Sequence, residues 1–362
     1  MAAPRLIFIL PGRLETRTGG YEYDRRMLAG LRDRGWSVAV EELDDSFPDP
    51  TSAAVDHAAR VLAAIPDAAT VLVDGLAFGA MPAEVEREAS RLRMVALVHL
   101  PLAEEVGLDR GAADRLKAGE RRALAAAKLV VVTGRATVPA LAQYGVGRDR
   151  IAVVEPGVDR VPLARGSKGP SAHLLCVATL NPGKGHEILI RALAMVPRRN
   201  WRLTCAGSLD RHPATVERVR ATLREDGLED RVSLVGELDP AALAACYDSA
   251  DLFVLATLHE TYGMAVAEAL ARGLPVVSTE TGAIPELVEE QRARSGVRLQ
   301  PDQPAGLLVP PGDADALADA LSLVLGDARV RERLAEGARR VRDRLPTWSD
   351  AVSQMAAALE RV

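Results

Sequence analysis

The chain has few aromatic residues, few cysteines and no excess of basic residues. Aromatic side chains make up 3% of its 362 residues, so no stacking surface for a polysaccharide is evident. The formal net charge is −5 at pH 7, which argues against binding to nucleic acid through the overall field of the protein. The three cysteines, Cys176, Cys205 and Cys246, lie in apolar segments, and we interpret them as buried free thiols and not as a disulfide or a metal site.

Long apolar runs are also lacking. The run Leu6–Leu10 is too short for the apolar core of a signal peptide and far too short to span a bilayer. No other stretch approaches the roughly 18 apolar residues that a membrane-spanning helix needs. We expect a cytoplasmic protein without a transmembrane segment, for which peripheral membrane contact stays open.

The length of 362 residues predicts two domains, because a single hydrophobic core rarely extends beyond about 250 to 300 residues. Short aliphatic runs alternate with alanine-rich segments of helical spacing, which indicates parallel α/β units. We predict strands at 6–10, 38–41, 70–74, 94–98, 129–133 and 151–154, and again at 174–178, 203–206, 232–234, 252–255 and 275–278. The fold class is therefore α/β, with two Rossmann-like domains.

The segment 161–172, which is rich in Pro, Gly, Ser and Lys, is typical of a linker. We place an N-terminal domain at 1–165, a C-terminal domain at 166–345 and a last helix, 346–362, that crosses back to the first domain. The basic stretch Gln291–Gln303 is interpreted as a surface insertion.

The segment 252–278 is the most informative one, because it predicts strand, loop, helix, glycine stop and strand. Glu260 should lie in the loop at the carboxyl end of a strand, where ligands bind in open α/β sheets. Thr261, Tyr262, Gly263 and Met264 should form the first turn of the next helix, whose free N–H groups suit a diphosphate. Glu268, two turns along that helix, could accept hydrogen bonds from ribose hydroxyls.

A lysine follows the first strand of the predicted second domain. Lys184 stands in the segment 181–186, Asn-Pro-Gly-Lys-Gly-His, at the same strand-end edge as Glu260. A lysine binds phosphate well as a point charge.

With these motifs the chain resembles glycosyltransferase family 4 (glycosyl transferases group 1), the retaining enzymes of the GT-B fold, in which two Rossmann-like domains face each other across a cleft. The resemblance rests on Glu260 and Glu268, with seven residues between them, and on the Lys184-Gly185 pair. It implies that Glu260 contacts the donor sugar and that Glu268 holds the ribose. It further implies that Lys184 and Thr261–Met264 hold the diphosphate, without a metal or any other cofactor.

The resemblance implies further donor contacts and shows one departure. Gly207 and Val235 fit the places where the family lines its sugar and base pockets. Family members commonly carry an arginine where this chain has Thr179, which we still count among the donor-binding residues. The departure leaves Lys184 to supply most of the local positive charge.

Candidate residues of the first domain also follow predicted strands. Gly19 and Gly20 would let a phosphate or sugar approach the backbone, although a simple tight turn is the alternative. His99 follows the strand 94–98, where family members carry a histidine near the donor sugar, so we take Glu260, His99 and Lys184 as the candidate catalytic residues. Arg17, Tyr21 and Asp74 are weaker candidates for acceptor binding.

The sequence thus predicts a retaining glycosyltransferase that moves a sugar from a UDP- or GDP-linked donor to a small-molecule acceptor. A nucleotide-sugar epimerase or phosphorylase on the same fold is one alternative, because a fold does not determine a function. A catalytically silent protein that binds nucleotide or carbohydrate is another. A dinucleotide-dependent dehydrogenase is disfavoured, since the first strand is not followed by Gly-x-Gly-x-x-Gly.

Overall fold

The computed structural model describes residues 4–197, 200–288 and 304–362, which form two compact units. Unit 1 comprises Met1–Gly157 and Pro346–Val362, and unit 2 comprises Val158–Leu345. The division precedes the linker predicted at 161–172, because Val158 is already buried in the core of unit 2. The stretch Gln291–Gln303, interpreted above as a surface insertion, lies outside the described residues.

Unit 1 is built on a six-stranded parallel sheet in the order β2-β1-β3-β4-β5-β6. Its strands are β1 (Arg5–Pro11), β2 (Ser37–Leu43), β3 (Thr70–Asp74), β4 (Arg93–Val98), β5 (Leu129–Val132) and β6 (Ile151–Val153). The strand order reverses between β1 and β3, and ligands of open α/β sheets bind at the carboxyl side of such a switch point.

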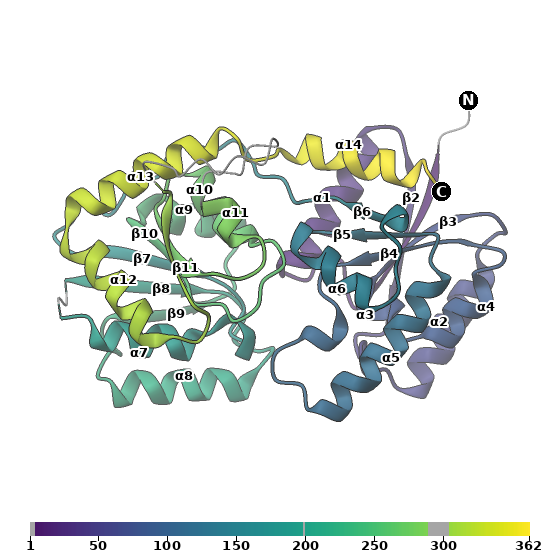
Figure 1. Ribbon diagram of the computed structural model, residues 1–362, viewed down its shortest axis with the longest axis horizontal. Coiled ribbons are helices and arrows are strands. Elements are labelled where there is room, and N and C mark those ends of the chain that lie inside the picture. Colours follow the sequence, from purple (N-terminus) through teal and green to yellow (C-terminus); the bar gives the residue numbers. More distant parts are fainter. Residues whose placement is uncertain (1–3, 198–199, 289–303) are drawn as a thin grey trace. The chain divides into compact units, whose positions relative to one another are not determined.

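Along the chain, the helices of unit 1 alternate with its strands. The last helix comes from the end of the chain and belongs to the same unit (Figure 1). They are α1 (Gly19–Asp33), α2 (Ser52–Ala64), α3 (Gly75–Phe78), α4 (Pro82–Glu88), α5 (Arg110–Ala126), α6 (Val138–Gln143) and α14 (Trp348–Leu359), with short 3₁₀ helices η1 (Leu102–Glu104), η2 (Arg135–Thr137) and η3 (Arg148–Arg150). Helix α14 packs on α1 so closely that a Cβ atom on Gly30 would lie 2.4 Å from a methyl group of Val352.

Unit 2 contains a second six-stranded parallel sheet, in the order β12-β11-β10-β7-β8-β9. Its strands are β7 (Ala172–Val177), β8 (Trp201–Ala206), β9 (Val232–Gly236), β10 (Leu252–Leu255), β11 (Val276–Thr279) and β12 (Gly306–Val309). Numbered within the unit this is the order 3-2-1-4-5-6 of the Rossmann fold, with its switch point between β7 and β10. Strand β12 was not predicted, because its run Gly306–Val309 is short and begins with glycine.

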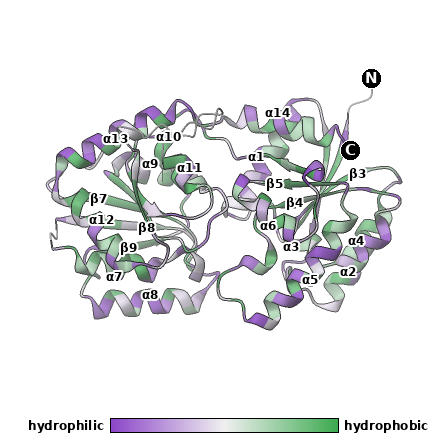
Figure 2. Ribbon diagram, viewed as in Figure 1, coloured by the Kyte–Doolittle hydropathy of each residue, from purple (hydrophilic) through white to green (hydrophobic). Residues whose placement is uncertain are grey.

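The helices of unit 2 are η4 (Pro182–Lys184), α7 (His186–Met195), α8 (Pro213–Glu225), α9 (Pro240–Ser249), α10 (Met264–Ala271), α11 (Ile284–Val288), α12 (Ala314–Gly326) and α13 (Ala328–Arg342). Figure 2 shows hydrophobic strands and helices that carry both hydrophobic and hydrophilic residues. Trp201, Tyr247 and Phe253 are completely buried in this unit, as expected for a sheet covered on both faces.

Side-chain caps mark where many of the helices begin. Thr18, Asp109 and Asp313 accept a hydrogen bond from the backbone N–H three residues further on, which satisfies a donor that the helix itself leaves free.

The prediction of two Rossmann-like α/β domains is confirmed. Among the described residues, every helix is too short or too polar to traverse a bilayer.

Candidate active site

Lys184 and Glu260 form an ion pair in unit 2. Lys184 Nζ lies 2.7 Å from Glu260 Oε2, and both side chains are largely buried, with exposed fractions of 26% and 15%. Lys184 ends η4, just beyond β7, and Glu260 lies in the loop that follows β10. Because β7 and β10 are the neighbouring strands at which the order reverses, the pair lies at the position where open α/β sheets bind ligands.

Close backbone contacts hold the Lys184 loop against the Glu260 loop. The backbone N–H of Leu258 donates to the Gly183 carbonyl at 2.7 Å, and the Thr257 hydroxyl donates to the same oxygen at 3.1 Å. Gly185 has φ +64°, and a Cβ atom there would lie 2.0 Å from the carbonyl oxygen of Ala256. Glycine is therefore required next to Lys184, because any side chain would push the two loops apart.

The loop after Glu260 differs from the prediction that residues 261–264 form the first helical turn. Helix α10 begins at Met264, and Gly263, its N-cap residue, has φ +94°, a conformation that ends the loop but is not helical. Thr261 and Tyr262 therefore precede the helix, and Tyr262 is 5% exposed. Of the four residues, only Met264 belongs to the first turn.

Glu268 lies on α10, where its side chain is half-buried. The hydroxyl of the buried Tyr247 donates to Glu268 Oε2 at 3.0 Å, and the Arg272 guanidinium lies 4.3 Å from the centre of the Tyr247 ring. These contacts fix the position of the Glu268 carboxylate.

The other predicted donor residues lie at the ends of β7, β8 and β9. A Cβ atom on Gly207 would lie 2.0 Å from the Ala178 carbonyl, so glycine permits the backbone after β8 to approach Thr179 and the end of β7. The N–H of Gly207 donates to the Gly236 carbonyl at 2.9 Å. Val235 is 40% exposed, unusual for a valine in a strand.

Unit 1 has a pocket of about 130 Å³ at its own switch point. Its walls follow the ends of β1, β3 and β4, and the lining residues are Thr18, Gly20, Tyr21, Asp74, Gly75, Leu76, His99 and Leu100. Gly20, Tyr21, Asp74 and His99 are thus brought together, whereas Arg17 and Gly19 are exposed and are not among the residues that line the pocket. Helix α1 begins at Gly19, so the glycine pair forms its first turn.

His99 lies between two buried aspartates. Its Nε2 atom is 3.1 Å from Asp24 Oδ1 and 3.6 Å from Asp74 Oδ2, and its ring meets Tyr23 edge-on. Asp24, from α1, is 1% exposed, and its Oδ2 atom has no hydrogen-bond partner among the described residues. Asp24 was not predicted as a site residue, because 75 residues separate it from His99 and no motif in α1 points to it.

Burial and mutual charge shift the pKa values of this cluster. Burial and the neighbouring Asp24 carboxylate raise the pKa of Asp74 to about 7, against the opposing effects of His99 and the Leu76 N–H. Burial alone would lower the pKa of His99, but the two aspartates outweigh it and raise the pKa above 6.5. Both groups therefore hold a proton more tightly in the folded protein than in the unfolded chain.

This arrangement predicts that Asp74→Asn flattens the pH dependence of stability. A raised pKa contributes stability at low pH, and for Asp74 that contribution is lost between its ordinary value of 3.8 and about 7. The wild-type melting temperature should fall from pH 5 to pH 8 by several degrees more than that of the variant. Thermal unfolding checks this, with the exposed Asp49→Asn as control; equal slopes for wild type and Asp74→Asn would contradict it.

Solved structures match both units. Sucrose-phosphate synthase from Thermosynechococcus elongatus aligns with a TM-score of 0.81 at 20% identity, covering 99% of this chain and 98% of the other. The Anabaena protein HepE in complex with UDP and glucose aligns with a TM-score of 0.77 at 20% identity, covering 99% and 100%. The fold is thus GT-B, the class of two-domain proteins with a Rossmann-like sheet in each domain.

The second unit, which holds Lys184, Glu260 and Glu268, is similar to a known family. Residues 171–327 match the family model of glycosyl transferases group 1. This match agrees with the resemblance found from the motifs.

Curated relatives are glycosyltransferases. A D-inositol 3-phosphate glycosyltransferase of Corynebacterium glutamicum is 30% identical over 59% of this chain, and the match spans only about half, 52%, of that relative's length. An MMP alpha-(1->4)-mannosyltransferase of Mycolicibacterium hassiacum is 26% identical, and the match covers 90% of this chain and 79% of the relative.

Proposed function

We propose that this protein is a retaining, metal-independent glycosyltransferase that transfers a sugar from a UDP- or GDP-linked donor to a hydroxyl of a small acceptor. The proposal rests above all on the Lys184–Glu260 ion pair at the switch point of unit 2. Two relatives, which are named as an inositol-phosphate glycosyltransferase and a mannosyltransferase, support the proposal. The UDP held by HepE supports a nucleotide-diphosphate donor.

In this proposal the two partners of the ion pair separate when the donor binds. The Lys184 ammonium moves to the diphosphate, where negative charge grows as the sugar departs, and so lowers the barrier to transfer. Glu260 then accepts hydrogen bonds from sugar hydroxyls in place of the lysine. In the absence of donor each charge is satisfied by the other, so neither is left unpaired in a largely buried site.

The remaining residues are assigned by position. Backbone groups of Thr261–Met264, Thr179, Gly207 and Val235 border the donor, and Glu268 binds the ribose. We assign a part of the acceptor to the pocket of unit 1, with Tyr21 and Asp74 in its wall. The two aspartates raise the pKa of His99 and so favour its protonated form, from which the ring donates a hydrogen bond to a substrate oxygen in this proposal.

Ligand-induced thermal stabilisation tests the proposal. The melting temperature is measured with UDP, GDP, ADP and TDP, each with Mg²⁺ and with EDTA. We expect one nucleotide to stabilise the protein equally with Mg²⁺ and with EDTA, by about 2.7 kcal/mol at a concentration 100 times its Kd. Turnover of the matching nucleotide sugar only when acceptor is added would separate a transferase from an epimerase. No stabilisation by any nucleotide would refute the assigned donor site.

A further inference from the structure

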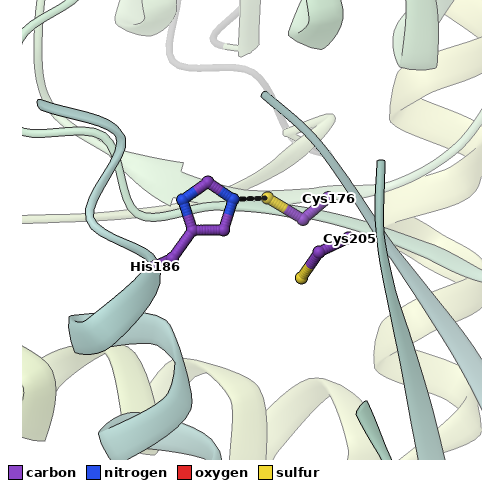
Figure 3. Close-up of side chains that lie close together, drawn as sticks. All are labelled: Cys176, His186 and Cys205. Atoms are coloured by element: carbon purple, nitrogen blue, oxygen red, sulfur yellow. Dashed lines mark hydrogen bonds between the residues drawn. The ribbon is translucent and has the colours of Figure 1, made fainter. Parts of the chain in front are cut away.

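Two cysteines and a histidine meet inside unit 2, and none of the three is among the residues assigned to the donor. Cys176 and Cys205 are direct neighbours across the parallel strands β7 and β8, so their side chains project from the same face of the sheet. His186 is the first residue of α7, and its ring points at Cys176 from that side (Figure 3). The two sulfur atoms and a ring nitrogen lie within 4.8 Å of one another.

The spacing of these atoms suits three of the four ligand positions around a tetrahedral metal ion. Zinc binds sulfur at about 2.3 Å and imidazole nitrogen at about 2.0 Å, which puts a sulfur and a nitrogen ligand about 3.5 Å apart. Cys176 Sγ and His186 Nε2 are 3.7 Å apart. The third ligand atom, on Cys205, is close enough to join them after a small adjustment of its side chain.

The surroundings favour a bound cation over an unoccupied cluster. The three residues are 1%, 2% and 0% exposed, in the order Cys176, His186 and Cys205. His186 Nδ1 is buried without a hydrogen-bond partner in the part of the chain that the structure describes. The burial of all three ligand atoms would keep water away from a cation that they hold.

We propose that Cys176, Cys205 and His186 bind a Zn²⁺ ion in the core of unit 2. Thiolate and imidazole are the ligand types that zinc prefers, and harder ions such as Mg²⁺ and Ca²⁺ take oxygen ligands instead. The site is structural: it joins β7, β8 and the first residue of α7. It also fixes the residue directly after Gly185, and thereby the end of the loop that carries Lys184.

The site takes no part in sugar transfer, and its test is independent of the proposed function. Cys205, 29 residues after Cys176, reaches it by strand pairing, and His186, 10 residues after Cys176, reaches it at the start of α7. Such separations explain why the cysteines were interpreted from the sequence as free thiols.

Metal binding to the full-length protein tests the proposal. The protein, free of affinity tags, is reduced and stripped with a chelator, then titrated with Zn²⁺ by calorimetry and with Co²⁺ in a spectrometer. We expect one Zn²⁺ per chain, a higher melting temperature with Zn²⁺, and the sulfur-to-metal charge-transfer band of thiolate-bound Co²⁺. Cys176→Ala, Cys205→Ala and His186→Asn should each abolish high-affinity binding. Cys246→Ala should leave it unchanged, because Cys246 lies outside the cluster.

Either of two results would overturn the inference. One is a wild-type protein that binds no Zn²⁺, or binds Co²⁺ without the thiolate band. The other is unchanged binding in the Cys176 and Cys205 variants. If a core variant fails to fold, the Zn²⁺ titration and the Co²⁺ spectrum of the wild-type protein still decide.

Discussion

Replacing Lys184 by alanine should lower kcat/KM for the nucleotide-sugar donor by about 100- to 1,000-fold, the usual effect of removing one group that stabilises developing negative charge. Lys184 is the cation that the structure places at the end of β7, beside Glu260, and Thr179 stands where relatives in the family commonly carry a second one. Affinity for the free nucleoside diphosphate should fall about tenfold or more, since a hydrogen bond to a charged group contributes about 1.5 to 3 kcal/mol. Donor turnover and calorimetry measure the two effects.

Two further variants show whether the loss comes from this particular ammonium group. Lys184→Arg keeps a positive charge and should retain part of the activity, although its planar group does not reproduce a point charge. Lys168→Ala removes an exposed lysine of the same unit and should behave as wild type. A Lys184→Ala protein that folds, as judged by its melting temperature, and stays within about threefold of wild-type kcat/KM would exclude the proposed role.

Replacing Glu260 by glutamine should have the opposite effect on nucleotide binding. The wild-type lysine must leave Glu260 Oε2, 2.7 Å away, before it can bind a diphosphate. Glutamine has nearly the same shape but no charge, so the lysine is released more easily and the free nucleotide should bind as tightly as before or more tightly. Transfer should still slow by about 100-fold, because charged hydrogen bonds to the sugar are lost.

The contrast between the two variants is the informative result. Affinity for the nucleotide falls when the lysine is removed and holds or rises when the carboxylate is neutralised, while both variants lose turnover. Glu332→Gln, an exposed change on α13, provides the control for loss of one negative charge in unit 2. If Glu260→Gln weakened nucleotide binding as strongly as Lys184→Ala, the carboxylate would serve to hold the lysine in place and not to bind the sugar.

Strand positions were predictable because parallel strands buried on both faces form short, continuous aliphatic runs. Each of the predicted strands corresponds to one in the structure, although the ends of most differ by one or two residues in either direction. Residues 261–263 were placed in a helix wrongly, because their composition does not reveal the φ of +94° that Gly263 adopts. A Cβ atom on Gly263 would lie 3.1 Å from Ile284 and 3.6 Å from Leu287, which come later in the chain.

The sequence by itself determined that the chain is α/β and that Lys184, Glu260 and His99 follow strands. The reason is physical: local hydrophobic periodicity sets the strands, and the carboxyl ends of parallel strands meet at one edge of their sheet.

Only the tertiary structure decided which of these groups touch. Lys184 and Glu260 are 76 residues apart, and they pair because β7 lies next to β10 in the sheet. His99, which follows β4, meets Asp24 of α1 because both elements belong to unit 1. Cys176 meets Cys205 because β7 pairs with β8, and it meets His186 at the start of α7. Strand order arises from the packing of whole elements, which no local run of residues records, so these three clusters appear only in the folded protein.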